Sequence, residues 1–264
     1  MQSVPKIGLA LGSGGALGIA YIGILDELVK AKIPIYCITG SSIGAVIGGM
    51  FAGGATTKQM EDFCKKLKIS SIIDIGFGGL GFVKGNKAVA QLEKAMKMFG
   101  VENSVEKCKI KFGTVATNLL TAKTDYLTTG KLTDIMRASF SIPGVFRPFE
   151  YNETLYVDGG PLCRVPVRLA KKLGAEYVVG IDCVGATRKM GKDDIDKYGK
   201  VILRVLYMSD YAISHEEMME ANMLVDMHQK EGDPMSLKYL EQSLEYGHKY
   251  GKKLVKDLKQ QFAF

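Results

Sequence analysis

The sequence predicts an α/β fold in which helices flank a mostly parallel central sheet, as a three-layer sandwich. Strand-like and helix-like segments alternate from Lys6 to Cys183, a pattern typical of parallel strands joined by helices. Two glycine-rich turns lie where a strand-like segment gives way to a helix-like one. The 264 residues, 47% hydrophobic and 24% charged, suffice to bury one full core. We therefore expect one domain over residues 1–264, with an α/β core at 6–184 and a peripheral helical part at 185–264.

The segments before residue 69 follow this alternation closely. Short β-branched or apolar runs predict strands, and apolar residues at helical spacing, such as Ile22, Leu25 and Leu28, predict helices. Thr56 or Thr57 can cap the third helix. The predicted strands are residues 6–11 and 33–38, and the predicted helices are residues 18–31, 43–54 and 56–68.

The later segments repeat the pattern and then change in character. After Cys183 the chain becomes charged and helical, with no further convincing strand, and residues 185–200 read as a surface connection. Before that point, the predicted strands are residues 109–117, 154–158 and 176–183, and the predicted helices are residues 133–140 and 165–173.

An uncharged run from Ile33 to Thr57 is long enough to span a bilayer, so a membrane helix is the alternative there. The run contains Pro34, two serines and six glycines, and its apolar clusters are short. Its β-branched and aromatic start favours a buried strand, and its glycine-rich end favours a close-packed helix. Strand, turn and helix is therefore the better interpretation.

Charge and cysteine content narrow the range of partners and compartments. Lys and Arg exceed Asp and Glu by 35 to 28, which gives a net charge of +7 and favours anionic surfaces. No nucleic-acid-binding pattern accompanies these charges, so we expect no nucleic-acid partner. The five scattered cysteines include no C-x-x-C pair, and the apolar run Ile7–Leu11 is too short for a signal peptide. These features predict a cytoplasmic protein.

Residues 40–44 read G-x-S-x-G and centre on Ser42, between a predicted strand and a predicted helix. A nucleophilic serine needs this spacing because it sits on a strained turn, where Gly40 and Gly44 avoid crowding the strand and the helix. The pattern alone is weak, since a chain with 31 glycines can produce it by accident. The strand–turn–helix context strengthens it.

Asp158 is the candidate base for this serine, although a structural role is also open. The three histidines, His215, His228 and His248, all lie in the late charged helices and read as ordinary helix residues. Asp158 ends a predicted strand and precedes Gly159 and Gly160, which permit a tight turn beneath a reacting group. An Asp-Gly pair is also a strong hairpin signal, and this segment alone favours the hairpin.

The glycine-rich turn at residues 11–18, LGSGGALG, is a candidate anion site because backbone amides at a helix N-terminus bind negative charge. Leu17 replaces the third glycine of a dinucleotide fingerprint, and the Lys-Ser/Thr pair of a P-loop is missing. An oxyanion hole is the specific interpretation that survives.

Together these pieces resemble the patatin-like phospholipase family. The resemblance runs from about Lys6 to Asp182, and its motifs are specific in combination even though each is weak alone. The matching stretches are LALGSGGALGIAYIGIL, ITGSSIGAVIGG and ATNLLTAKTDYLTTGKLTDIMRASFSIPGVFRPFEYNETLYVDGGPLCRVPV, with SLEYGHKYGKKL matching more loosely.

The resemblance implies a patatin-like fold and a lipid acyl hydrolase, of phospholipase A or lysophospholipase type, that cleaves carboxylic esters through a Ser-Asp dyad. By position, it makes Ser42 the nucleophile, Asp158 the base, and the amides of Gly14 and Gly15 the oxyanion donors. It implies no metal and no organic cofactor. The supporting motif glycines are Gly12, Gly40, Gly44, Gly159 and Gly160.

The chain departs from the family pattern at two positions. Leu17 stands where the family usually has Arg or Lys, and Arg164 stands where it often has Asn. The first change puts phosphate handling or loop anchoring in doubt. A catalytically silent lipid-binding scaffold, in which Leu17 would mark lost function, is one alternative. A soluble carboxylesterase or thioesterase that uses the same dyad on short acyl chains is another, and the oligomeric state is not predicted.

Residues 70–83, SSIIDIGFGGLGFV, are a candidate lipid-contact loop. Bulky apolar residues, among them Phe77, Leu80 and Phe82, alternate with pliable glycines, and the positive net charge favours an anionic membrane surface. A buried loop packed on the sheet has the same composition. Both interpretations, peripheral membrane contact and core packing, stay open.

Overall fold

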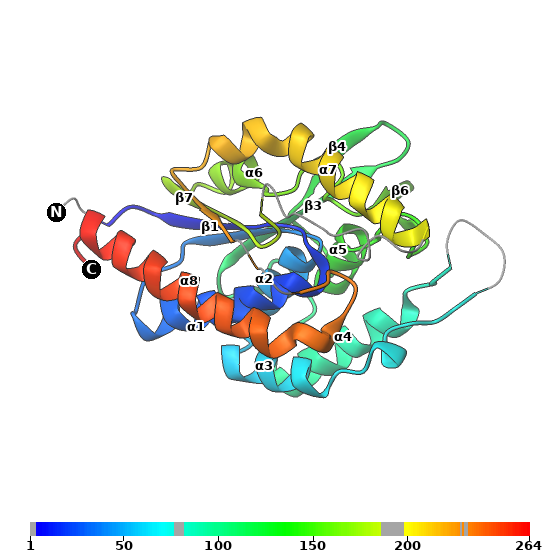
Figure 1. Ribbon diagram of the computed structural model, residues 1–264, viewed down its shortest axis with the longest axis horizontal. Coiled ribbons are helices and arrows are strands. Elements are labelled where there is room, and N and C mark those ends of the chain that lie inside the picture. The colour runs from blue at the N-terminus through cyan, green and yellow to red at the C-terminus, as the bar shows by residue number, and fades with distance from the viewer. Residues whose placement is uncertain (1–3, 77–81, 186–197, 228, 230–231) are drawn as a thin grey trace.

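The computed structural model describes residues 4–76, 82–185, 198–227, 229 and 232–264. An eight-stranded sheet runs through its centre in the order β5-β6-β3-β2-β1-β7-β8, with β4 paired to β3 (Figure 1). The strands are β1 (Ile7–Leu11), β2 (Cys37–Ser41), β3 (Lys111–Asn118), β4 (Lys123–Leu127), β5 (Phe149–Tyr151), β6 (Thr154–Val157), β7 (Tyr177–Asp182) and β8 (Met223–Asp226).

The middle of the sheet is parallel and one side of it is antiparallel. Strands β3, β2, β1, β7 and β8 pair in parallel, whereas β6 and β4 pair with β3 in antiparallel register, and β5 continues from β6. All residues of β1, β2 and β7 are buried. Full burial is expected for parallel strands, because helices cover both faces of such a sheet.

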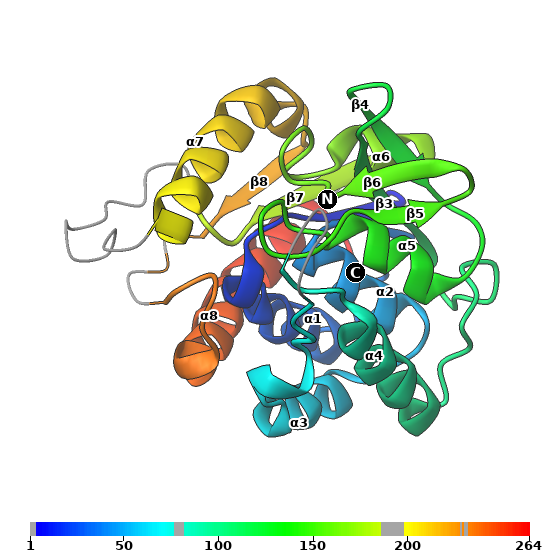
Figure 2. The ribbon, with the colours of Figure 1, turned by 90° about the vertical axis from the view of Figure 1, so that its right-hand side faces the viewer.

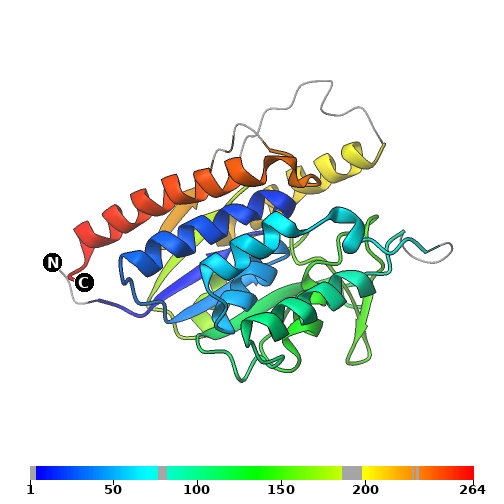
Figure 3. The same cartoon turned by 90° about the horizontal axis from the view of Figure 1, so that it is seen from below.

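Helices lie on both faces of the sheet and complete the three layers (Figures 2 and 3). Helices α6 and α7 lie on one face, where Ala10 of β1 and Val178 of β7 join a small apolar cluster. The other face carries the larger core, with Leu9 and Leu11 of β1. The helices are α1 (Ala20–Lys30), α2 (Ile43–Ala52), α3 (Thr57–Lys66), α4 (Asn86–Phe99), α5 (Leu132–Ser139), α6 (Val167–Lys172), α7 (Tyr198–Met219) and α8 (Leu240–Gln261).

The predicted three-layer fold is confirmed, and so is most of the predicted element order. The Thr56 hydroxyl caps α3 by accepting from the Gln59 amide, and the Gln59 side chain accepts from the Thr56 amide. The second predicted strand begins at Cys37 and not at Ile33. The sequence did not reveal α4, β4 or β5.

The prediction of no strand after Cys183 is wrong. Strand β8, Met223–Asp226, pairs with β7 in parallel and extends the central sheet. It is short and only half-buried, so it lacks both the length and the apolar alternation that identify a strand. The segment predicted as a surface connection, residues 185–200, lies mostly outside the described residues.

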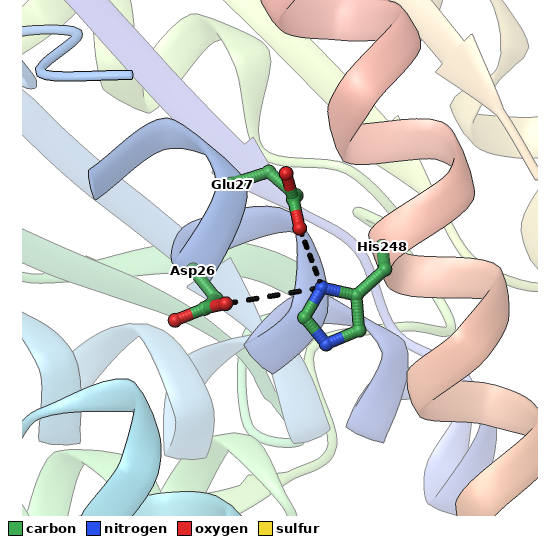
Figure 4. A group of neighbouring side chains, drawn as sticks. All are labelled: Asp26, Glu27 and His248. Atoms are coloured by element: carbon green, nitrogen blue, oxygen red, sulfur yellow. Dashed lines mark hydrogen bonds and ion pairs between the residues drawn. The ribbon is translucent and has the colours of Figure 1, made fainter. Parts of the chain in front are cut away.

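Helix α8 is also less peripheral than predicted, because it packs along α1. Leu244, Leu254 and Leu258 of α8 are buried in the main core. At the α1–α8 contact, His248 Nδ1 lies 2.8 Å from Glu27 Oε1 and 3.8 Å from Asp26 Oδ2 (Figure 4). Within α1, Lys30 Nζ lies 2.6 Å from Asp26 Oδ2 and 3.6 Å from Glu27 Oε1, so both carboxylates have a cationic partner, and His248 provides the contact to α8.

The uncharged run from Ile33 to Thr57 forms β2, the turn at Ser42 and α2. No helix in the described part of the chain is long and apolar enough to cross a membrane. The strand–turn–helix interpretation of this run is therefore confirmed.

Candidate active site

Ser42 occupies a strained turn between β2 and α2. Its backbone has φ 54° and ψ −119°, values that non-glycine residues rarely adopt. A Cβ on Gly40 would lie 2.4 Å from the Ala45 nitrogen, and a Cβ on Gly44 would lie 2.2 Å from the Leu11 carbonyl oxygen. The turn can therefore close only with glycine at both positions, which gives the G-x-S-x-G spacing its physical cause.

The Ser42 side chain is directed at Asp158, which follows β6. Ser42 Oγ donates to Asp158 Oδ2 at 2.5 Å, and the Gly160 amide donates to Asp158 Oδ1 at 2.8 Å. Both Ser42 and Asp158 are buried. Burial raises the pKa of Asp158 to about 7, while the hydrogen bonds from Ser42 and Gly160 lower that pKa in part. The turn that was a hairpin candidate thus brings a carboxylate to the serine.

Three hydroxyl residues hold this pair in place, and the sequence analysis did not identify them. The Ser42 amide donates to Ser139 Oγ at 2.9 Å, and Thr114 Oγ1 lies 2.9 Å from the same Oγ atom. Thr117 Oγ1 donates to the Asp158 carbonyl oxygen at 2.9 Å. No local pattern distinguishes these residues from other serines and threonines, because the sheet brings them to the site from distant segments.

The glycine-rich turn after β1 lies beside the pair. Gly14 has φ 148° and lines the same cavity as Ser42 and Asp158. Among the described residues, the amides of Gly12 and Ser13 donate to carbonyl oxygens of Ile181 and Arg164, whereas no acceptor is found for the amides of Gly14 and Gly15. The Gly14 amide thus belongs to a residue of the cavity wall and has no acceptor among the described residues.

The Leu17 side chain does not point into this cavity. Leu17 is 1% exposed, belongs to the main core and lies against Gly232. Its carbonyl oxygen accepts from Gln229 Nε2 at 3.0 Å. Leu17 therefore fills the core, and the side chain of Gln229, which follows β8, anchors the glycine-rich turn.

Arg164, the second departure from the family pattern, is a buried ionic centre. Its guanidinium contacts Asp182 at the end of β7 at 3.0 Å and Asp210 of α7 at 2.9 Å, and it also donates to the Tyr207 carbonyl oxygen. Arg164 is 1% exposed. It thereby fastens α7 to the end of the sheet beside Asp158. Neither the role of Arg164 nor that of Asp210 was evident from the sequence.

Two cavities of different size share a wall residue at this site. The cavity that holds Ser42 and Asp158 has a volume of about 30 Å³ and is closed on one side by α7. The second cavity, of about 290 Å³, has almost entirely apolar walls contributed by α2, α3 and α4. Ile142 lines both cavities, and Ile43, the residue after Ser42, lines the apolar one.

The remaining predicted residues fall outside this centre. Phe77 and Leu80 of the predicted lipid-contact loop lie outside the described residues, whereas Phe82 is described and is 72% exposed. His228 is also outside them. His215 lies exposed on α7, and His248 pairs with Glu27 at the α1–α8 contact.

Comparison with known proteins agrees with the fold and with the motifs. A family model described as patatin-like phospholipase matches residues 9–171. An uncharacterized NTE family protein of Mycobacterium tuberculosis is 32% identical over 198 residues, which is 73% of this chain and 53% of that protein. Lysophospholipase NTE1 of Meyerozyma guilliermondii is 31% identical over 185 residues, which is 67% of this chain but 12% of that protein.

A solved structure extends the similarity to the whole fold. VipD from Legionella pneumophila superimposes with a TM-score of 0.64 at 15% identity, covering 97% of this chain and 68% of VipD. At this identity the likeness concerns the fold alone. The chain spans about half the length of the mycobacterial relative and a small part of the yeast one.

Proposed function

Because the chain belongs to the patatin-like phospholipase family, we propose that it is a lipid acyl hydrolase of phospholipase A or lysophospholipase type. The observation that carries the proposal is the buried contact between Ser42 Oγ and Asp158 Oδ2, at 2.5 Å, next to an apolar cavity. A strained serine, a carboxylate and free backbone amides are the parts that ester hydrolysis needs. The relatives named lysophospholipase support the lipid substrate.

In the proposed first step, Asp158 accepts the Ser42 hydroxyl proton while Oγ attacks the carbonyl carbon of the ester. The tetrahedral intermediate collapses, the bond to the alcohol oxygen breaks, and the alcohol leaves with the proton from Asp158. Asp158 then takes a proton from water, whose oxygen attacks the acyl-enzyme and releases the fatty acid as Ser42 regains its proton. A pKa of about 7 suits Asp158 to this exchange near neutral pH.

The oxyanion of each tetrahedral intermediate needs donors that are already in place. The amides of Gly14 and Gly15 are our candidates, because Gly14 lines the Ser42 cavity and both amides lack acceptors among the described residues. Ser13 Oγ, buried in the same cavity wall and also without a described partner, is a further polar group there. Preorganised donors of this kind stabilise charge that develops only during reaction.

The apolar cavity supports a long acyl chain as the group that is transferred. Its walls include Ile43 and Ile47 of α2 and Phe63 of α3, and burial of a chain stabilises binding by about 0.8 kcal/mol per methylene. A carboxylesterase or thioesterase acting on short acyl groups would gain little from a cavity of about 290 Å³. We therefore rank lipid esters above short esters as substrates.

We also propose a cytoplasmic protein with peripheral contact to anionic membranes. All five cysteines are free, which fits a reducing compartment. Phe82, 72% exposed in the segment predicted to contact lipid, is the described residue that supports contact there. Phe82→Ser should weaken co-sedimentation with anionic vesicles while leaving the melting temperature unchanged. A lowered melting temperature with unchanged vesicle binding would instead favour core packing of this loop.

Hydrolysis by purified protein tests the proposal. Wild type should cleave p-nitrophenyl acyl esters and release fatty acid from lysophospholipid, whereas Ser42→Ala should lose both activities by at least about 10³-fold. The matched control is Thr121→Ala, which removes an exposed hydroxyl from the turn between β3 and β4. Undiminished hydrolysis in Ser42→Ala would contradict the assignment. Vesicle binding without any hydrolysis in wild type would favour the scaffold alternative.

A further inference from the structure

The Ser13 side chain is a buried hydroxyl in the wall of the cavity that Ser42 and Asp158 line. Ser13 is 3% exposed, and its Oγ atom has no hydrogen-bond partner in the described part of the chain. Burial of a hydroxyl without a partner costs free energy, so such a group calls for an explanation. Neither the packing of the turn nor the acylation step gives this hydroxyl a task.

The backbone holds Ser13 in place from both sides. Its amide donates to the Arg164 carbonyl oxygen at 2.9 Å, and its carbonyl oxygen accepts from Cys183 Sγ at 3.3 Å. Neither contact involves the Ser13 side chain, so the ends of neighbouring elements fix where the hydroxyl lies. A substitution that removes only Oγ should therefore leave the turn intact.

Ser13 Oγ lies on the same side of the cavity as the proposed base. A Cβ on Gly160 would lie 3.0 Å from Asp158 Oδ1 and 3.1 Å from Ser13 Oγ. The two oxygens therefore border the same face of Gly160, whose lack of a side chain leaves space beside both. A small polar molecule in that space would have a hydroxyl and a carboxylate within its reach.

The cavity beside these oxygens suits a water molecule. Its volume is about 30 Å³, it is partly open, and its walls include Ser42 Oγ as well as the Ser13 hydroxyl and the Asp158 carboxylate. Buried waters typically make about three hydrogen bonds, and they satisfy polar groups that would otherwise stay unpaired. A water at this place would give Ser13 Oγ a partner and would lie next to the reacting serine.

Formation of an acyl-enzyme would give such a water a second partner. Ser42 Oγ carries no proton once it is acylated, so Asp158 Oδ2 loses the donor that it has in the free protein. A water can then donate one hydrogen bond to Asp158 and the other to Ser13 Oγ. Two such bonds direct a lone pair of the water oxygen toward the acyl carbon.

We propose that Ser13 Oγ positions the water that hydrolyses the acyl-enzyme. The water oxygen forms a bond to the acyl carbon while Asp158 takes one of the water protons. The bond from that carbon to Ser42 Oγ then breaks, the proton passes from Asp158 to Oγ, and the fatty acid leaves. Ser13 keeps its own proton throughout. This role rests on the proposed function and concerns only its second step.

Ser13→Ala separates the second step from the first. Because p-nitrophenol leaves readily, hydrolysis of the acyl-enzyme limits kcat for p-nitrophenyl esters, whereas acylation determines kcat/KM. In Ser13→Ala, kcat and KM should both fall about 10-fold, the scale of one hydrogen bond in the transition state. The ratio kcat/KM and the rate of fluorophosphonate labelling should stay within about 2-fold of wild type. Acyl-enzyme should accumulate during turnover, as measured by mass spectrometry of acid-quenched protein.

Ser41→Ala is the matched control, because Ser41 Oγ is also buried without a partner among the described residues but does not line this cavity. Its kcat and KM should match those of wild type. Both variants should keep the wild-type melting temperature or exceed it, since each loses an unpaired buried hydroxyl.

Two results with Ser13→Ala would overturn the role of Ser13. An unchanged kcat would show that its hydroxyl takes no part in hydrolysis. Equal losses in kcat and kcat/KM, with slower fluorophosphonate labelling, would assign the hydroxyl to acylation. A wild-type protein that neither hydrolyses the esters nor reacts with the fluorophosphonate would overturn the proposed function together with this role.

Discussion

The two cavities that share Ile142 in their walls differ in size and in the residues that line them. The smaller one, of about 30 Å³, is lined by Ser42, Asp158 and Gly14. The larger one, of about 290 Å³, has space and apolar walls but almost no polar surface. The first is built from turns at the ends of strands, and the second from the sides of helices. If the proposed function is right, chemistry and acyl binding depend on different parts of the chain, and substitutions should alter them separately.

The largest effect on activity is expected when Asp158, the proposed general base, is replaced. Asp158→Asn keeps the shape of the side chain but abolishes proton acceptance, so turnover of p-nitrophenyl esters should fall by about 10²- to 10⁴-fold. The melting temperature should stay near that of wild type. His215→Ala and His248→Ala should do far less, and a histidine variant as inactive as Asp158→Asn would point to a different base.

The stability of the folded protein should depend on Arg164, which pairs with Asp210 in the wall of the small cavity. Arg164→Met leaves the carboxylates of Asp182 and Asp210 buried without their cation, which should lower the free energy of unfolding by about 3 kcal/mol or more. Arg168→Met removes an exposed arginine from the same region, where the loss should stay within about 1 kcal/mol. Chemical denaturation of both variants measures the contrast. Equal, small losses would show that the buried ionic centre contributes little.

The pH dependence should follow Asp158 alone. With a pKa of about 7, kcat/KM should fall about 10-fold from pH 8 to pH 6, because the carboxylate becomes protonated. Asp210 and Tyr207 face the same cavity, and burial raises the pKa of Asp210 to about 7 as well, so Asp210→Asn must retain the inflection. If the inflection disappears in Asp210→Asn, the titrating group is Asp210 and the prediction for Asp158 is wrong.

The raised pKa of Asp158 should also make the stability of the folded protein depend on pH. A carboxyl whose pKa is raised in the folded protein binds more protons folded than unfolded, so its contribution is present below about pH 4 and is lost as the pH rises through about 7. Wild type should therefore lose stability relative to Asp158→Asn over that range. Denaturation midpoints of the two proteins at several pH values give this difference directly.

The large cavity should control acyl preference without affecting the chemistry. Val46→Phe places a larger side chain in its wall, one turn after Ser42, and should lower kcat/KM for a long-chain ester by about 4-fold, the value of one excluded methylene. Activity on a short-chain ester should stay near wild type, and the exposed substitution Val29→Phe should change neither. A parallel loss on both esters would mean that the cavity does not hold the acyl chain.

The sequence predicted the turns that line the small cavity, but it did not predict the large cavity, and the reason is physical. A strained serine turn and its neighbouring glycines are local requirements, so G-x-S-x-G and the turn at residues 11–18 could be identified from spacing. The apolar cavity depends on how α2, α3 and α4 pack, and α4 was not recognised at all. Helix faces that line a cavity have the same composition as faces that fill a core.

The C-terminal region was the least predictable part of the fold. Strand β8 is only four residues long and gains its place by pairing with β7. Arg164 was recognised as unusual, but its pairing with Asp182 and Asp210 joins residues from separate elements that no spacing rule connects. Helix α7 was predicted only as part of the peripheral helical region. Its contribution to the Ser42 cavity, from Leu203, Leu206, Tyr207 and Asp210, follows from the fold alone.

Localisation of a fluorophosphonate adduct tests the central claim most directly. Mass spectrometry of labelled, proteolysed protein should find one adduct, on Ser42 in the peptide that spans Gly40 to Gly44. The adduct should be absent in Ser42→Ala and should form much more slowly in Asp158→Asn, because the carboxylate that accepts the Oγ proton at 2.5 Å is gone. An adduct on a different residue, or ester hydrolysis that continues while Ser42 remains unmodified, would contradict the account.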